Sequence, residues 1–105
     1  MANESPEALW KCIDKRIHEP ARLGLIAELV RAPHRLAFTY LRDSLGLTQG
    51  NLASHLKALE EAGYISVARS GAPADSATYI RLTERGREAL VEYLEALGRL
   101  VGRLS

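Results

Sequence analysis

The chain has 105 residues, of which 47% are hydrophobic and 26% charged, and both its length and its composition are typical of one soluble globular domain. The formal net charge is only +1, so the total charge does not argue for or against a nucleic-acid partner. Cys12 is the single cysteine, which excludes an internal disulfide. Because no secretory signal and no long apolar run is present, the sequence predicts a cytoplasmic protein with no membrane role.

Three helices are expected in the first half of the chain. Ser5-Pro6-Glu7 is a typical helix opening, and apolar residues at 9, 13 and 17 predict a helix over residues 6–18. The next helix is expected over residues 20–31, because Pro20 can open it and Pro33 prevents its continuation. Residues 34–37 are expected to form a short edge strand, and residues 38–45 a third helix.

The stretch from Thr48 to Gly63 predicts a helix whose two sides differ. Leu52, Leu56 and Leu59 recur at helical spacing and are expected to be buried, with Thr48 as N-cap and Gly63 as a left-handed end. The other side of the first two turns carries small or polar groups and no carboxylate, namely Gln49, Gly50, Asn51, Ser54, His55 and Lys57. Such groups suit an approach to base edges and phosphates, whereas an ordinary solvated polar face is the alternative.

Residues 38–63 have the layout of a helix-turn-helix, because only a short turn separates the two expected helices. Beyond Gly63, alternating β-rich residues predict a hairpin with strands over residues 64–69 and 77–82 and a small polar tip between them. Arg69 and Arg81 lie on the two arms, and Ser70 begins the tip. These residues could follow a DNA backbone, and solvated arginines are the alternative.

A last helix is expected to begin after Thr83 and to carry two apolar flanks. The first flank steps by four and three residues, as in a heptad seam, and consists of Leu90, Leu94, Leu97, Val101 and Leu104; the second consists of Ala89, Tyr93, Ala96 and Leu100. We expect the first helix of the same chain to cover one part, and a second subunit related by a two-fold axis to cover the other. The predicted dimer interface is Leu9, Trp10, Ile13, Ile17, Leu90, Tyr93, Leu94, Leu97, Leu100, Val101 and Leu104. For Trp10, a cap over the chain's own core is the alternative.

Three motifs in this order resemble the winged-helix DNA-binding family, in particular the small MarR/ArsR-like transcriptional regulators. They are His18-Glu-Pro-Ala-Arg22, residues 45–64, and residues 78–87 with the sequence Thr-Tyr-Ile-Arg-Leu-Thr-Glu-Arg-Gly-Arg. The resemblance implies one domain over residues 1–105, mainly α with a small β-hairpin: a three-helix core plus a wing, with dimerisation helices at both ends. It places the helix-turn-helix at 38–63, the wing at 64–82 and the C-terminal dimerisation helix at 83–103. It also implies a homodimer whose recognition helix, which begins at residue 48, enters the major groove.

The roles of the histidines and of Cys12 have to be considered one residue at a time. Relatives commonly carry His at the position of His55, either for a DNA contact or, as we favour, for a hydrogen bond that fixes the helix to the next strand. Cys12 is interpreted as a core filler, with a redox switch as the alternative. No metal site is expected, because metal-sensing relatives use paired cysteines or clustered histidines, whereas His18, His34 and His55 are spread over three elements. No cofactor is expected either.

The sequence therefore predicts a sequence-specific transcriptional regulator that binds double-stranded DNA as a homodimer. An enzyme is not expected, because no paired carboxylates, activated nucleophile or phosphate-binding glycine loop can be assembled. The predicted DNA contacts are Thr48, Gln49, Gly50, Asn51, Ser54, His55, Lys57, Arg69, Ser70 and Arg81. The alternative is a winged-helix module that binds protein within a larger complex, and the near-neutral charge and Asp75 at the wing tip support it. The sequence leaves open whether a small molecule controls binding.

Overall fold

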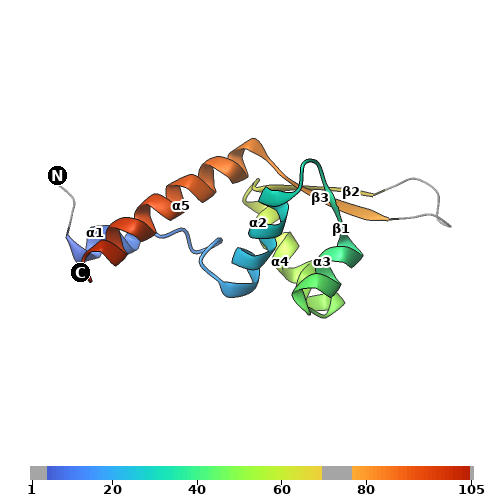
Figure 1. Ribbon diagram of the computed structural model, residues 1–105, viewed down its shortest axis with the longest axis horizontal. Helices are drawn as coiled ribbons and strands as arrows, with labels where there is room; N and C mark the ends of the chain where they lie inside the picture. Colours follow the sequence, from blue (N-terminus) through green and yellow to red (C-terminus); the bar gives the residue numbers. More distant parts are fainter. Residues whose placement is uncertain (1–4, 70–76, 105) are drawn as a thin grey trace.

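The computed structural model describes residues 5–69 and 77–104, and in this part of the chain five helices and three short strands follow one another (Figure 1). The elements are α1 (Pro6–Lys11), α2 (Pro20–Arg31), β1 (Leu36–Ala37), α3 (Phe38–Leu45), α4 (Gln49–Glu61), β2 (Ile65–Arg69), β3 (Thr78–Leu82) and α5 (Glu84–Gly102). The expectation of a mainly helical chain with a small β-hairpin is confirmed.

Side-chain caps begin most of these helices where the sequence predicts. The hydroxyl of Thr48 accepts from the Asn51 amide at 3.1 Å, and that of Thr83 accepts from the Gly86 amide at 3.0 Å. Each hydroxyl thereby satisfies one of the amides that a helix start leaves without a partner. After α4 the chain reverses at Gly63, whose φ of 81° lies in the left-handed region that favours glycine.

The first helix is shorter than expected, because α1 ends at Lys11 and residue 18 lies well beyond it. Asp14 is the reason. Its carboxylate accepts from the Arg16 amide at 2.8 Å and from the Tyr64 hydroxyl at 2.5 Å, so a local turn replaces the helical bonds. This turn brings Ile17 into the core, where its side chain is fully buried. The prediction of a helix over residues 6–18 was wrong in its second half.

The three strands form an antiparallel sheet in the order β1-β3-β2. Val67 lies opposite Ile80, and Ile65 opposite Leu82, so these residues share the inner face of the sheet. Ile80 and Leu82 are buried there. Because side chains alternate along a strand, Tyr79 and Arg81 belong to the opposite, outer face.

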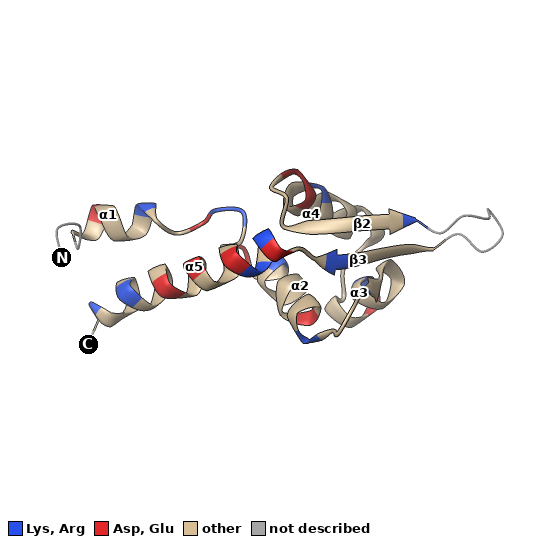
Figure 2. Ribbon diagram, turned by 90° about the horizontal axis from the view of Figure 1, so that it is seen from above, with Lys and Arg blue, Asp and Glu red and all other residues tan. Residues whose placement is uncertain are grey.

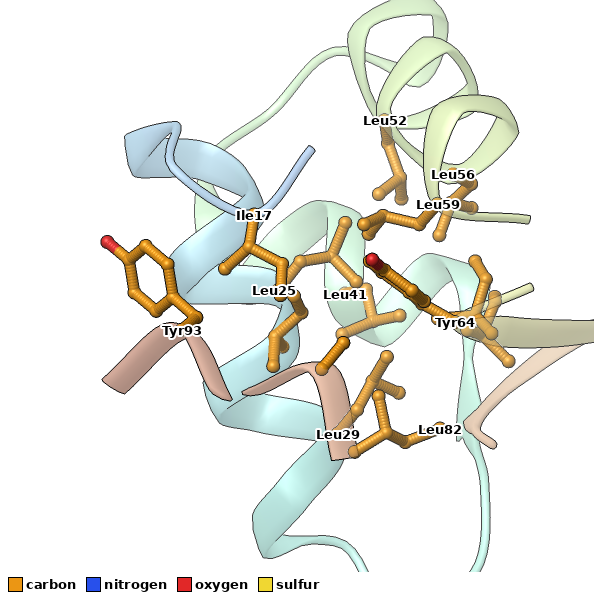
Figure 3. Packing of buried hydrophobic residues seen from close by; sticks show 14 residues of the cluster. Ile17, Leu25, Leu29, Leu41, Leu52, Leu56, Leu59, Tyr64, Leu82 and Tyr93 are labelled. Atoms are coloured by element: carbon orange, nitrogen blue, oxygen red, sulfur yellow. The ribbon is translucent and has the colours of Figure 1, made fainter. Parts of the chain in front are cut away.

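The core joins α2, α3 and α4 to the inner face of the sheet (Figure 3). Leu25 and Leu29 of α2 and Leu41 of α3 meet the predicted leucine stripe of α4, which is Leu52, Leu56 and Leu59. All of these leucines are buried, and each contributes about 1.5–3 kcal/mol relative to an exposed side chain. The stripe therefore holds α4 by one side and leaves its other side outward.

α1 and the C-terminal half of α5 form an arm that extends away from this core (Figure 1). The extents are 57 × 25 × 22 Å and the radius of gyration is 15.9 Å, against about 13 Å for a compact domain of this length. α1 packs along α5, as the sequence predicts. None of the helices in the described part combines the length and apolarity needed to cross a bilayer.

Candidate nucleic-acid interface

The polar side of α4 faces solvent. Thr48, Gln49, Gly50, Asn51, Ser54 and Lys57 are all exposed, whereas Leu52, Leu56 and Leu59 on the opposite side are buried. Within residues 5–69 and 77–104, the side chains of Gln49, Asn51 and Ser54 form no hydrogen bond with the rest of the chain. Their donors and acceptors are therefore available to an external ligand.

His55 differs from its neighbours because the chain itself uses its imidazole. Its Nδ1 accepts a hydrogen bond of 3.1 Å from Arg22 Nε, so the ring proton is on Nε2, which lies 3.9 Å from the Glu19 carboxylate. That carboxylate also accepts from the Arg22 amide at 2.8 Å and so caps α2. These contacts tie α4 to the first turn of α2. The expectation that a hydrogen bond of His55 fixes α4 to the next strand was wrong, because its partner is in α2.

The same contacts act on the charge of Glu19. The hydrogen bond from the Arg22 amide holds the pKa of Glu19 below its ordinary value. An ionised Glu19 suits its position, because negative charge is favoured at the start of a helix. The first turn of α2 and the middle of α4 are thus joined by charge-assisted contacts.

A cleft of about 350 Å³ separates α4 from the hairpin. α4 contributes Gln49, Ala53 and Lys57 to its lining, and the hairpin contributes Val67, Arg69 and Thr78. The structure therefore brings Arg69 together with the polar face of α4. Glu60 lines the same cleft and reduces its positive charge.

A neighbouring hollow of about 410 Å³ adds residues of α3 that the sequence analysis missed. Thr39 and Arg42 line it together with Gln49 and Thr78. Arg42 is paired with Asp43 at 2.8 Å, which holds the pKa of the Asp43 carboxyl below its usual value. The helix-turn-helix layout could have indicated these residues, because the first helix of that motif crosses the DNA backbone.

Arg81 does not join this surface. It pairs in register with Ser66, whereas Arg69 pairs with Thr78, so the two arginines lie on opposite faces of the hairpin. Arg81 is therefore not among the predicted DNA contacts that the structure brings together. Ser70 and the tip around it lie outside the described residues.

The predicted dimer residues divide into three groups. The first group is buried within its own chain and cannot meet a partner as predicted: Leu9, Ile17 and Tyr93. The Tyr93 hydroxyl also lies 2.8 Å from Nδ1 of His18 in the same chain. The half-buried group is Ile13, Leu90, Leu97 and Leu100, and the exposed group is Trp10, Leu94, Val101 and Leu104. Val91, which the sequence analysis did not select, is 55% exposed. The second flank of α5, with Ala89, Tyr93 and Ala96 at its centre, is the side that packs on its own chain.

The interpretation of Cys12 as a core filler was wrong. Its side chain is exposed just after α1, where it follows the last residue of the helix. Within residues 5–69 and 77–104, no three His, Cys, Asp or Glu side chains are grouped so that they could hold a metal ion.

Comparisons with known proteins agree with this geometry. Residues 21–101 match the winged helix DNA-binding domain family. A transcriptional regulator homologue from Pyrococcus horikoshii OT3 is 26% identical with a TM-score of 0.80, over 94% of this chain and 95% of that one. The transcriptional repressor CouR, solved on a 23-mer DNA duplex, shares the fold at 24% identity and a TM-score of 0.64, over 93% and 73% of the two chains.

One curated relative is an uncharacterized protein of Methanocaldococcus jannaschii. It is 42% identical over 57 residues, which are 54% of this chain and 62% of that protein. This chain therefore matches less than two thirds of that relative's length. The family match, the sheet order and the exposed polar face of α4 together lead to one conclusion: the chain belongs to the winged helix DNA-binding domain family.

Proposed function

We propose that the protein is a sequence-specific transcriptional regulator that binds double-stranded DNA as a homodimer, with the first half of α4 in the major groove. One observation carries the proposal: Gln49, Asn51 and Ser54 are exposed together on the side of α4 that faces away from the core. An α-helix fits the major groove, where amide side chains can pair with adenine and hydroxyls with several bases. These three side chains would supply the base preference.

Charged and small groups around these side chains suit the DNA backbone. Lys57 and Arg69 line the cleft beside α4 and would approach phosphates, while Thr48 and Gly50 mark the exposed start of the helix. A β-carbon built at position 50 meets no other described atom within 4 Å, so this turn presents an open surface. Affinity should then fall as salt rises, because each neutralised phosphate releases counterions.

The arm supports the homodimer. Trp10, Val91, Leu94 and Val101 are each more than half exposed, and Leu104 is 86% exposed, so α1 and α5 offer a large uncovered apolar surface. A second copy related by a two-fold axis would cover it, with the half-buried Ile13, Leu90, Leu97 and Leu100 at the margin. The two α4 helices would then meet half-sites about one helical turn, roughly 34 Å, apart.

The test starts from duplexes that the purified protein selects from fragments of its source genome, measured by gel shift at several salt concentrations. Asn51→Ala should relax base preference, whereas Lys57→Ala should weaken all duplexes similarly and lower the salt slope by about 1. Glu61→Gln is the matched control on α4, because Glu61 lies at the far end of the helix. Wild-type binding that is indifferent to sequence would refute the proposal of a specific regulator.

A second candidate function is a winged-helix module that binds another protein through the same cleft. The observation in its favour is Glu60, whose carboxylate lines the cleft beside Lys57 and would repel phosphates. A stoichiometric protein partner, combined with no DNA affinity even at low salt, would favour this candidate. High affinity for selected duplexes would exclude it as the main role of the cleft.

A further inference from the structure

A second basic surface lies where the hairpin meets α5. A hollow of about 430 Å³ is lined there by His34 and Arg35 from the loop before β1, Arg81 from β3, and Arg87 from α5. We call these four residues the outer basic patch. Glu84 is the one acid among the described residues that line the hollow, and within the described chain no arginine of the patch is paired with a carboxylate. The patch therefore carries a local excess of positive charge, although the whole chain is nearly neutral.

The patch is separate from the candidate nucleic-acid interface. Arg81 lies on the outer face of the sheet, whereas Arg69 shares the inner face with Thr78 beside α4. Figure 2 shows the same separation along the hairpin: basic positions mark the end of β2 that is remote from α5 and the end of β3 that leads into it. A duplex that rests on the polar face of α4 would therefore meet different residues from those of the outer basic patch.

One arginine of the patch is already oriented. The guanidinium carbon of Arg35 lies 4.0 Å from the centre of the Tyr79 ring, a cation–π contact that holds the charged group against the outer face of the sheet. A guanidinium held by its flat face can still donate through its edges, and its paired donors match the two oxygens of a carboxylate. Pro33, which is exposed, adds apolar surface to the same hollow.

We propose that the outer basic patch is a docking site for an acidic segment of another protein. Carboxylates on flexible side chains can reach Arg35, Arg81 and Arg87 separately and avoid Glu84, and the apolar border suits the rest of a peptide. A duplex is less suited, because its phosphates are fixed along a continuous track and Glu84 would oppose them. The proposal does not depend on the role of α4.

Fluorescence anisotropy with two labelled probes tests the proposal: a ten-residue glutamate peptide, and a duplex that the protein binds. The patch variant combines Arg81→Ala with Arg87→Ala, and the matched control combines Lys57→Ala with Arg69→Ala; all four side chains are exposed, so both variants should fold. The patch variant should lose about tenfold or more in peptide affinity and keep its duplex affinity. The control should show the reverse pattern.

Three results would overturn the proposal. The first is a wild-type protein that does not bind the peptide at low salt, and the second is a control variant that loses peptide affinity as much as the patch variant does. The third is a patch variant that loses duplex affinity as strongly as peptide affinity, which would make the patch a nucleic-acid surface. Failure of the wild type to bind any duplex would refute the proposed function instead, since the peptide measurements would still stand on their own.

Discussion

Replacing Gly86 by alanine should disrupt the junction between α4 and the arm. A β-carbon at position 86 would lie 2.2 Å from the carbonyl oxygen of Tyr64 and 2.8 Å from a methyl group of Leu82. The Tyr64 carbonyl cannot easily move, because it accepts a hydrogen bond of 3.0 Å from the Thr83 amide. The Thr83 hydroxyl also holds Gly63, the residue before Tyr64, because it donates to the Gly63 carbonyl at 2.7 Å.

The size of the effect follows from three contributions. Overpacking against a fixed backbone atom costs about 3 kcal/mol, the upper end of the usual range. Breaking the hydrogen bond from the Thr83 amide to the Tyr64 carbonyl costs about 1 kcal/mol more. Alanine favours a helix over glycine by about 1 kcal/mol, which offsets that loss. The free energy of unfolding should therefore fall by about 3 kcal/mol for Gly86→Ala. For a chain of this size that lowers Tm by about 10–20 °C.

Urea unfolding followed by circular dichroism measures this change, at one fixed protein concentration because dimerisation would add to stability. Gly98→Ala is the matched control in the same helix: a β-carbon there meets no described atom within 4 Å, so the variant should be up to about 1 kcal/mol more stable than wild type. If Gly86→Ala were as stable as wild type, the close approach of α5 to Tyr64 would be refuted.

Three further substitutions test the Thr48 cap, the hydrogen bond from Tyr64 to Asp14, and His55. Thr48→Ala should lower the free energy of unfolding by about 1 kcal/mol in urea titrations, because the Asn51 amide loses its acceptor; an unchanged value would mean that water replaces the cap at no cost. Burial and the hydrogen bond to Asp14 raise the pKa of Tyr64, so the free energy of unfolding of the wild type should fall as the pH rises above about 10. Urea unfolding measured across alkaline pH should show a smaller fall for Tyr64→Phe. His55→Ala should cost about 1–3 kcal/mol, because Arg22 Nε is left without its acceptor, while base preference in competition gel shifts stays the same. Unchanged stability with altered base preference would instead make His55 a DNA contact.

Local signals were enough for most helix boundaries and for the two sides of α4. Pro20 and Pro33 bracket α2, and Thr48 and Gly63 bracket α4, because each acts through its own backbone or an amide three residues away. The periodicity of the leucines identified the buried side of α4, since spacing along a helix directly determines which side chains share a face. The exposed face of α4 then had to be the opposite, polar side of the helix.

Contacts between distant residues decided what the local signals could not. The turn after α1 depends on Asp14 bonding to Tyr64, 50 residues away, and apolar spacing alone could not reveal that the helix stops before it. The packed side of α5 was equally hidden, because both apolar flanks satisfy helical spacing and only the position of α1 and the core selects the one with Tyr93.

The sequence by itself determined the order of the elements, their caps and the side of α4 that is buried, because these depend on the intrinsic geometry of short segments. Only the tertiary structure decided that His55 binds Arg22, that Arg69 joins α4, and that Arg81 belongs to the outer basic patch. The physical reason is that register and packing place side chains from different segments in space. Single residues carry no sign of the partner they will meet.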